Sequence, residues 1–425
     1  MTSFWSIAAI AACILVAQRA TAQEQRDCAA QVDRKNLIPC ALEASLSVRV
    51  EEATLRATEG RRTAARVLLP SNPVLSLSAG RRSAEAGAQT TLNWAAELSQ
   101  ELEIAGQRSA RTRAADAELA AQKQRILLSK RDTASAAWTA YFSALAAKRE
   151  QELASTLLQA SRRMSAVAHG KAEQGLIAAV DADVVDAATM RVLQVKLAAS
   201  RKWAIATAEL SALLARDAAH PISQVDGELS PLAVADALAA PVSSETRPEA
   251  RLLADEQKVA SARADTLRRA RVPNPTLSVF AQNDGFDERV YGLGIAIPIP
   301  LPSPVGRTNA GEIAEFDAIG QRIQVERARL SRALGLELAT AAAELRAHQD
   351  AVAALSPQLL ERAERSLADL SDAVNTGKLS VRDALIAEQA LIELLQTNLS
   401  ERLELCLASV RLARALGRTL EEGAR

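Results

Sequence analysis

The chain has 425 residues, enough for two or three ordinary domains. Lys plus Arg and Asp plus Glu number 51 each, so the basic excess expected of a nucleic-acid-binding protein is missing. Only 3% of the residues are aromatic, while Ala, Leu, Glu, Arg and Gln are abundant. This composition is typical of long helices and coiled coils rather than of a compact mixed core.

The N-terminus has the pattern of a secretory signal peptide over residues 1–22. Residues 4–17 are apolar but too few to span a bilayer, and residues 20–22 (Ala-Thr-Ala) form a cleavage site with small residues. Residues 10–13 also resemble a lipobox ending at Cys13, but apolar residues continue past it, so the pattern favours cleavage after Ala22. No later stretch of about 20 apolar residues follows, so the sequence predicts an exported chain without a transmembrane helix.

The cysteines give one open question and one core residue. Cys28 and Cys40 either form a disulfide in an oxidising periplasm or remain two free thiols. Cys406 follows Ile392 and Leu399 at seven-residue steps, which predicts that it lies on the apolar side of a helix.

An internal repeat organises the rest of the chain. Asn72 and Asn274 each precede a proline and two alternating runs, and they are 202 residues apart. The same offset of 202 separates Gly175 from Gly377, and an aspartate follows six residues after each glycine. An internal repeat indicates that the chain consists of two copies of the same arrangement of elements. We therefore divide the mature chain into a first repeat, residues 23–230, and a second repeat, residues 231–425.

In the first repeat the pattern predicts a helix from Pro39 to about residue 69 and then a β-hairpin over residues 72–103. The hairpin strands alternate apolar with polar residues over about ten positions, the length that a tilted membrane strand needs. No proline occurs from 106 to 174, which predicts a helix far longer than a globular domain. Its Trp138, Tyr141 and Phe142 are interpreted as packing residues. A turn at 175–181, a helix to about residue 215 and a connector over 217–248 complete the repeat.

The second repeat has the same order: a helix over about 249–271, a hairpin over 274–300, a long helix over 307–376, a turn at 377–383 and a final helix. Asn283-Asp284-Gly285 is the predicted hairpin turn. Pro357 predicts a local bend in the long helix. Seven-residue steps predict coiled-coil packing of that helix, first at Leu338, Leu345, Val352 and Leu359 and then one position on at Leu360, Leu367 and Val374.

The turns at 175–181 and 377–383, called here the two tips, have the residues of a helix–helix connection. Gly175 and Gly377 are expected to end one helix in the left-handed conformation, and a Ser or Asp oxygen is expected to begin the next. For Asp181 and Asp383 two interpretations stay open: a helix cap, and a residue that gates a pore.

Together these residues resemble the TolC-like outer-membrane efflux protein family over essentially the whole mature chain. The resemblance rests on the Asn-Pro entries, the repeat, and the tip segments 175–187 and 377–390. Residues 98–115 and 297–318 look more narrowly like its heavy-metal cation efflux branch, of the Czc, Cnr and Ncc type. Within them, PIPLPSPVGRTNAG at 298–311 has an extra proline and lacks the phenylalanine of that branch.

The resemblance implies a fold that is mainly α with a minor β part. It comprises a long α-helical coiled-coil barrel plus four membrane β-strands per chain, with a trimer forming a twelve-stranded outer-membrane barrel. The strand residues expected to face lipid are Leu75, Leu77, Leu92, Trp94, Leu277, Tyr291, Leu293 and Ile295.

The function implied is that of a passive trimeric conduit, the outer-membrane channel component of a tripartite efflux system. It would export divalent heavy-metal cations of the cobalt, nickel, zinc and cadmium class from the periplasm to the exterior. The implied partners are two more copies of the chain, a periplasmic adaptor (membrane fusion protein), an inner-membrane resistance-nodulation-division pump and outer-membrane lipid. The implied location is the outer membrane of a Gram-negative bacterium, with a long periplasmic part.

The same resemblance implies a periplasmic gate at the tips, formed by Gly175, Asp181, Gly377, Arg382 and Asp383. The family's second tip acid is Ile386 here, which leaves one acidic ring in the second tip. The basic partner of Asp181 is replaced by Leu379, and Arg382 or Lys378 are the alternatives for that partner.

An enzyme is not predicted. The sequence has no nucleophile motif, phosphate-binding loop or metal-ligand cluster, and its three histidines are isolated, so no catalytic residue, cofactor or resident metal site is assigned. Two other functions stay open: the same channel serving multidrug or protein export, and a periplasmic coiled-coil scaffold or adaptor without a barrel.

Overall fold

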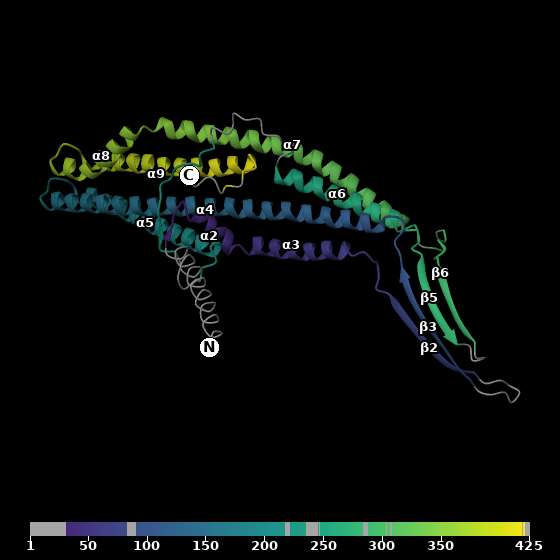
Figure 1. The fold of residues 1–425 in the computed structure, drawn as a ribbon. Helices are drawn as coiled ribbons and strands as arrows, with labels where there is room; N and C mark the ends of the chain where they lie inside the picture. Colours follow the sequence, from purple (N-terminus) through teal and green to yellow (C-terminus); the bar gives the residue numbers. More distant parts are fainter. Residues whose placement is uncertain are drawn as a thin grey trace, which may run out of the picture. The chain divides into compact units, whose positions relative to one another are not determined.

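The computed structural model describes residues 31–82, 91–216, 222–234, 245, 247–283, 288–302, 304–306, 308–418 and 420. They form two compact units. Figure 1 shows the element labels used below. Unit 1 takes its residues from 1–49, 128–243 and 333–425, and unit 2 from 50–127 and 244–332. Each unit therefore combines residues of both sequence repeats. The predicted signal peptide, Cys28 and the Asp284–Gly285 turn lie outside the described residues.

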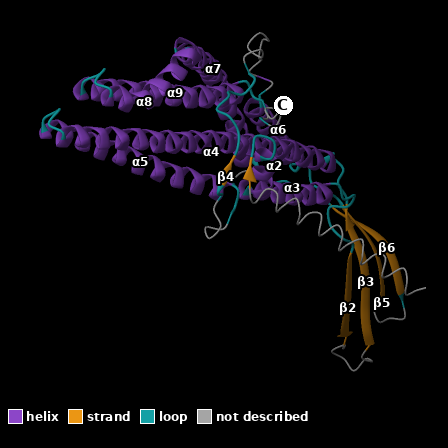
Figure 2. Ribbon diagram, turned by 90° about the vertical axis from the view of Figure 1, so that its left-hand side faces the viewer, coloured by secondary structure: helices purple, strands orange, loops and turns teal. Residues whose placement is uncertain are grey.

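Unit 2 contains a four-stranded antiparallel sheet, drawn in orange in Figure 2. Its strands are β2 (Val74–Arg82), β3 (Thr91–Glu101), β5 (Thr276–Asn283) and β6 (Arg289–Ala296), in the spatial order β2-β3-β5-β6. Each predicted hairpin is present, and the β3–β5 pairing joins the hairpin of one repeat to that of the other.

The helical part of unit 2 consists of α6 (Pro248–Arg269) and those parts of α3 (Leu46–Ala65), α4 (Gln107–Glu173) and α7 (Ala310–Ala354) that fall within its residues. Glu118 of α4 accepts hydrogen bonds from Arg61 of α3 at 3.2 Å and from Arg263 of α6 at 2.6 Å. Because one carboxylate holds two guanidinium groups, this network ties three helices together more firmly than an isolated surface pair would.

The core of unit 1 is built around the aromatic cluster of α4. Trp138, Tyr141 and Phe142 are fully buried, which confirms their interpretation as packing residues. The Tyr141 hydroxyl donates to the backbone oxygen of Asp226 at 2.6 Å, and Trp138 Nε1 donates to that of Leu420 at 3.2 Å. The cluster therefore holds both the connector and the C-terminal segment.

A short parallel pair beside this core was not predicted. Strand β1 (Gln31–Val32) pairs with β4 (Gln224–Val225), and α2 (Leu37–Ala44) follows β1. The sequence analysis treated both regions as irregular, because strands of two residues give no period-two pattern.

Long helices make up the rest of unit 1: α4 pairs with α5 (Ala179–Leu213), and α8 (Pro357–Asn375) pairs with α9 (Val381–Ala415). The helix expected over 307–376 does not merely bend at Pro357. It ends at Ala354, and Ser356 caps the new helix α8 by accepting from the backbone N–H of Leu359. This break explains why the seven-residue apolar pattern shifts by one position, from Leu359, which is exposed, to Leu360, which is buried.

The structure gives the state of two of the cysteines. Cys40 is disulfide-bonded, and its partner lies outside the described residues. Cys406 is a buried free thiol in the core of unit 1, as predicted, and burial raises its pKa to about 12.

Candidate functional site

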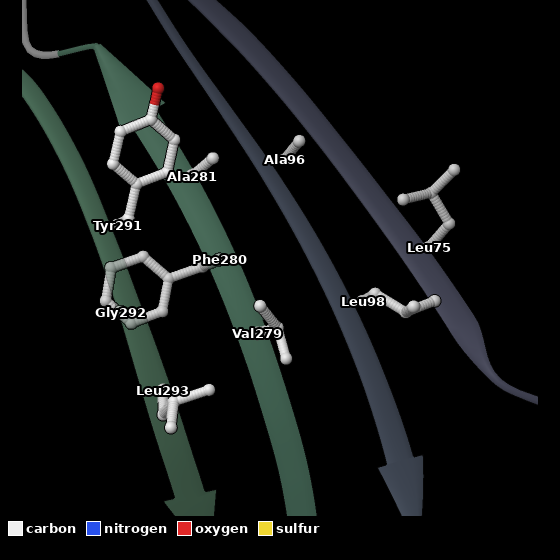
Figure 3. A pocket seen from close by; sticks show the side chains of 9 residues that line it. All are labelled: Leu75, Ala96, Leu98, Val279, Phe280, Ala281, Tyr291, Gly292 and Leu293. Carbon is white, nitrogen blue, oxygen red and sulfur yellow. The ribbon is translucent and has the colours of Figure 1, made fainter.

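The sheet of unit 2 has one apolar face. Residues directly opposite each other in an antiparallel pair share a face, so the register assigns every strand residue to a side. All eight residues predicted to face lipid fall on the same side, together with Ala79, Ala96, Leu98, Val279 and Ala281. Polar residues of the same side stand only at its two ends: Arg81, Asn283 and Arg289 at one end and Gln100 at the other. The face is open in the single chain: Leu77 and Leu293 expose 72% and 84% of their surface. Figure 3 shows part of it, a shallow hollow lined by Leu75, Leu98, Val279 and Leu293 among others.

The opposite face is polar. It carries Ser76, Ser78, Asn93, Glu97, Ser99, Glu101, Ser278 and Gln282. Among the apolar residues that also lie on this side, the largest is Phe280, directly opposite Gly292 of β6; the others are Val74, Ala95, Val290 and Ala296. A Cβ at Gly292 would lie 2.4 Å from the Phe280 ring, so the ring covers the space that the missing side chain leaves. The sheet therefore separates an apolar surface from a polar one, as a strand between lipid and water must.

The outer strands of the sheet are unpaired on one side. Among the described residues, β2 pairs with β3 alone and β6 with β5 alone. Each has a free row of backbone N–H and C=O groups along its outer edge, which is a template for pairing with another strand.

A hydrogen-bond network fixes the points where strands meet helices. Asn274, which enters the second hairpin, donates to Glu101 at the end of β3 at 2.7 Å. Its side-chain oxygen accepts from Gln107 at 2.9 Å, and Gln107 opens α4 and also donates to the backbone oxygen of Val272 at 3.2 Å. The Asn-Pro signal of the sequence therefore marks a residue that joins both hairpins to α4.

The neighbouring residues of the segment 98–115 extend this junction. Arg111 of α4 pairs with Glu103 and donates to the backbone oxygens of Ala65 and Val67, each at 3.2 Å, at the end of α3. Gly106 stands between strand and helix with φ +73°, where a Cβ would lie 2.7 Å from Arg269. The resemblance of this segment to a family branch gave no indication of its structural role, because its hydrogen-bond partners lie in other elements.

The two tips lie at the same end of unit 1 in both Figure 1 and Figure 2. Gly175 (φ +70°) and Gly377 (φ +73°) both adopt the left-handed conformation, as predicted. The residue after each glycine donates its backbone N–H to a backbone oxygen in the last turn of the preceding helix. Leu176 donates to Lys171 at 2.9 Å in the first tip, and Lys378 donates to Ala373 at 3.0 Å in the second. Both α4 and α8 therefore end in the same glycine cap.

The starts of the next helices differ. In the second tip the Ser380 hydroxyl accepts from the backbone N–H of Asp383 at 3.1 Å and donates to its carboxylate at 2.6 Å. In the first tip the corresponding cap is Ala178, which has no side-chain hydrogen bond, so Asp181 is left without a hydroxyl partner. Asp383 thus takes part in a helix cap, whereas Asp181 does not.

The core behind the tips packs four helices together. It contains Leu157 and Leu158 of α4, Val185 of α5, Leu367 of α8 and Ala384 of α9. Lys171 also donates its ammonium group to the backbone oxygen of Val374, which places a positive charge at the C-terminal end of α8. Neither Arg382 nor Lys378 forms an ion pair with Asp181 in the described part of the single chain.

The two histidines that the structure describes each lie beside a carboxylate. His169 of α4 lies 2.8 Å from the Asp186 carboxylate of α5, and His348 of α7 lies 2.9 Å from the Glu401 carboxylate of α9. His220 lies outside the described residues. Among those that are described, no group of three potential metal ligands comes together. Nor does any described helix combine the length and apolar character needed to cross a membrane.

Comparison with known proteins was made on this basis. The model of the outer membrane efflux protein family matches residues 37–216. No curated protein matches the sequence.

Several solved structures have the same fold. CusC, described in connection with transmembrane channel formation, has 17% identity and a TM-score of 0.72, with 91% of this chain and 92% of CusC covered. The outer membrane protein VceC from Vibrio cholerae has 19% identity and a TM-score of 0.70, with 91% and 96% covered. The MtrE outer membrane channel of Neisseria gonorrhoeae, in its open state, has 18% identity and a TM-score of 0.68, with 91% and 89% covered.

Proposed function

We propose that the chain is the outer-membrane channel of a tripartite efflux system, a passive conduit without enzymatic activity. The observation that carries this proposal is the sheet of unit 2, which has one continuous apolar face and open edges at β2 and β6. An apolar surface of this kind marks a contact with lipid or protein. The fold shared with CusC, VceC and MtrE supports the same conclusion.

Closure by further copies of the chain explains both features of the sheet. In lipid an open sheet edge leaves backbone groups unsatisfied, and closure into a barrel removes the edges. If β2 of one copy pairs with β6 of the next, three copies of four strands give a closed barrel of twelve. The apolar face then meets lipid and the polar face lines the lumen, with Trp94 and Tyr291 suited to the membrane interfaces.

The two tips are proposed as the periplasmic gate. In a trimer they bring three copies of Asp181 and three of Asp383 around one axis, while Gly175 and Gly377 allow the tight turns. A ring of carboxylates attracts cations, and most strongly divalent ones. Arg382, which is exposed beside Asp383, can moderate that charge.

The proposed cargo is the class of divalent heavy-metal cations that includes cobalt, nickel, zinc and cadmium. Residues 98–115 and 297–318, which resemble the heavy-metal branch, support this choice, and so does the acidic tip. The conduit needs no resident metal site, because an inner-membrane resistance-nodulation-division pump, connected by a periplasmic adaptor, selects the cargo and supplies the energy. The working location is the Gram-negative outer membrane.

A planar-bilayer measurement on Asp383→Ala tests the gate. We expect a larger single-channel conductance and a weaker block by Zn²⁺ or Co²⁺, since the variant removes one carboxylate ring from the narrowest point. Asp350→Ala, which removes an exposed carboxylate of α7 instead, is the control and should behave as the unmodified protein. Unchanged block in Asp383→Ala would contradict the proposed gate.

A further inference from the structure

Behind the tips, α4 carries a stripe of polar side chains that runs from the apolar core to the surface: Ser161 is buried, and His169 is exposed. Ser161, Ser165 and His169 are spaced four residues apart and so share one face of the helix. The surrounding core of α4, α5, α8 and α9 is formed mainly by Leu, Val and Ala side chains. Polar groups at such a place need partners, and the stripe finds them on two different helices.

The partners are two acids at equivalent positions of the repeat. Asp186 of α5 and Glu388 of α9 are 202 residues apart, each five residues after a tip aspartate. Asp186 accepts from the Ser165 hydroxyl at 2.6 Å and lies 2.8 Å from His169 Nε2. The Ser161 hydroxyl is close enough to Glu388 to lower the pKa of that carboxyl by hydrogen bonding. One face of α4 is therefore held by a carboxyl group from each repeat.

Glu388 is poorly suited to carry a charge. Only 4% of its surface is exposed, and its Oε1 atom is buried without a hydrogen-bond partner. Its single hydroxyl partner is shared, because Ser161 Oγ also lies 3.2 Å from Thr189 Oγ1 of α5. An ionised carboxylate in such a place costs much more than a protonated one, whose O–H can itself donate a hydrogen bond.

We propose that these groups form a proton-controlled contact that fixes α4 against α5 and α9 behind the tips, tight in acid and loose in alkali. We call it the polar seam, made up of Ser161, Ser165 and His169 of α4, Asp186 and Thr189 of α5, and Glu388 of α9. Its role in setting how easily the gate opens rests on the proposed channel function; the packing change itself does not.

Glu388 and His169 both have raised pKa values, so protonation of either one stabilises the polar seam. Burial raises the pKa of Glu388, against a smaller opposite effect of Ser161, and no charged side chain contributes. The hydrogen bond and charge of Asp186 raise the pKa of His169, and Asp183 and Glu173 add to this against a small effect of burial. The carboxyl of Asp186 itself has a lowered pKa, owing to Ser165 first and then His169, so it stays charged when His169 is protonated.

The signs of the linkage follow from these directions. A group whose folded-state pKa is raised stabilises the folded contact fully below its unfolded pKa, and that stabilisation is lost as the pH rises through the folded value. For Glu388 the loss begins above its ordinary value of 4.5, and for His169 above 6.5. Between pH 5 and pH 8 the polar seam therefore weakens continuously.

Hydrogen exchange of the full-length protein in lipid tests the packing change. We expect the amides of residues 157–173 and 381–392 to be more protected at pH 5 than at pH 8, after correction for intrinsic exchange, because the pKa values of Glu388 and His169 are both raised in the folded contact. Glu388→Gln combined with His169→Gln should abolish the difference. Ser161→Ala, which removes the donor to Glu388, should move the change to higher pH.

Matched controls leave the polar seam intact. Glu393→Gln changes an exposed acid of the same helix, and His348→Gln breaks the other histidine–carboxylate pair of unit 1; both should keep the pH profile of the unmodified protein. A pH-independent profile in the unmodified protein, or a retained profile in the double variant, overturns the proposal.

Conductance of the same proteins separates this proposal from the proposed function. We expect the open probability to rise from pH 5 to pH 8 in the unmodified protein and to be constant in the double variant. A pH-dependent protection without any conductance supports the polar seam and contradicts the channel.

Discussion

Ser380 and Ala178 occupy the same position in the two repeats, and they differ by one hydroxyl group. Because Ser380 both accepts from and donates to Asp383, it satisfies a backbone donor at the start of α9 and holds the tip carboxylate in place. At Ala178 the backbone oxygen still accepts from Asp181 at 2.9 Å, but no side chain does. We therefore expect the second tip to be the more ordered of the two.

Exchanging the two caps should reverse this order. Ser380→Ala is expected to destabilise the start of α9 by about 1 kcal/mol, and Ala178→Ser to stabilise the start of α5 by a similar amount, because Asp181 is placed to complete the same cap. Hydrogen exchange of residues 178–184 and 380–386 measures both effects. Equal exchange of the two segments in the unmodified protein would contradict this account.

Single residues also show how far the sequence could predict the site. The period-two pattern placed Leu75, Trp94 and Leu293 on a common face, and the strand register does the same, because a one-residue slip would turn the apolar residues of a strand to the polar side. The network of Asn274, Glu101 and Gln107 was not predictable, since its members come from different repeats and no local pattern pairs them.

At the scale of elements, prolines and glycines predicted those helix ends that depend on the residues of the end itself. Gly175 and Gly377 end their helices as expected, and Pro357 stands at a break. The break is complete because Ser356 caps the new helix, which a proline alone does not indicate. The β1–β4 pair was missed because it depends on a partner almost two hundred residues away, not on its own two residues.

The two faces of β5 allow a direct test of which side meets lipid. Val279 lies on the apolar face and Ser278 on the polar one, at neighbouring positions of the same strand. Val279→Arg is expected to cost about 2–4 kcal/mol if it faces the middle of the bilayer. It should therefore lower the yield of folded protein in the outer membrane, measured as the fraction that resists dissociation in detergent until heated.

Ser278→Arg is the matched control, because Ser278 lies opposite Gly294, which has no side chain to meet the added length. It should leave the yield nearly unchanged. Equal losses in both variants would mean that both faces are buried against protein, as in a scaffold without a membrane barrel.

At the scale of the whole molecule, the compact units do not follow the repeats. The sheet needs the hairpins of both repeats to bring β3 and β5 together, and the core behind the tips needs both helix pairs. The duplication is visible in the sequence as an offset of 202 residues. The offset does not predict how the two repeats pack against each other, because that depends on tertiary contacts. For the same reason the number of copies needed to close the sheet is a proposal drawn from its edges.

The measurement that tests the central claim most directly is single-particle electron microscopy of the full-length protein in lipid nanodiscs. The account predicts particles with threefold symmetry in which β2 of each copy pairs with β6 of the next, so that three four-stranded sheets close into one barrel within the lipid. Particles of a single copy, or trimers whose sheets stand outside the lipid with β2 and β6 unpaired, would contradict it.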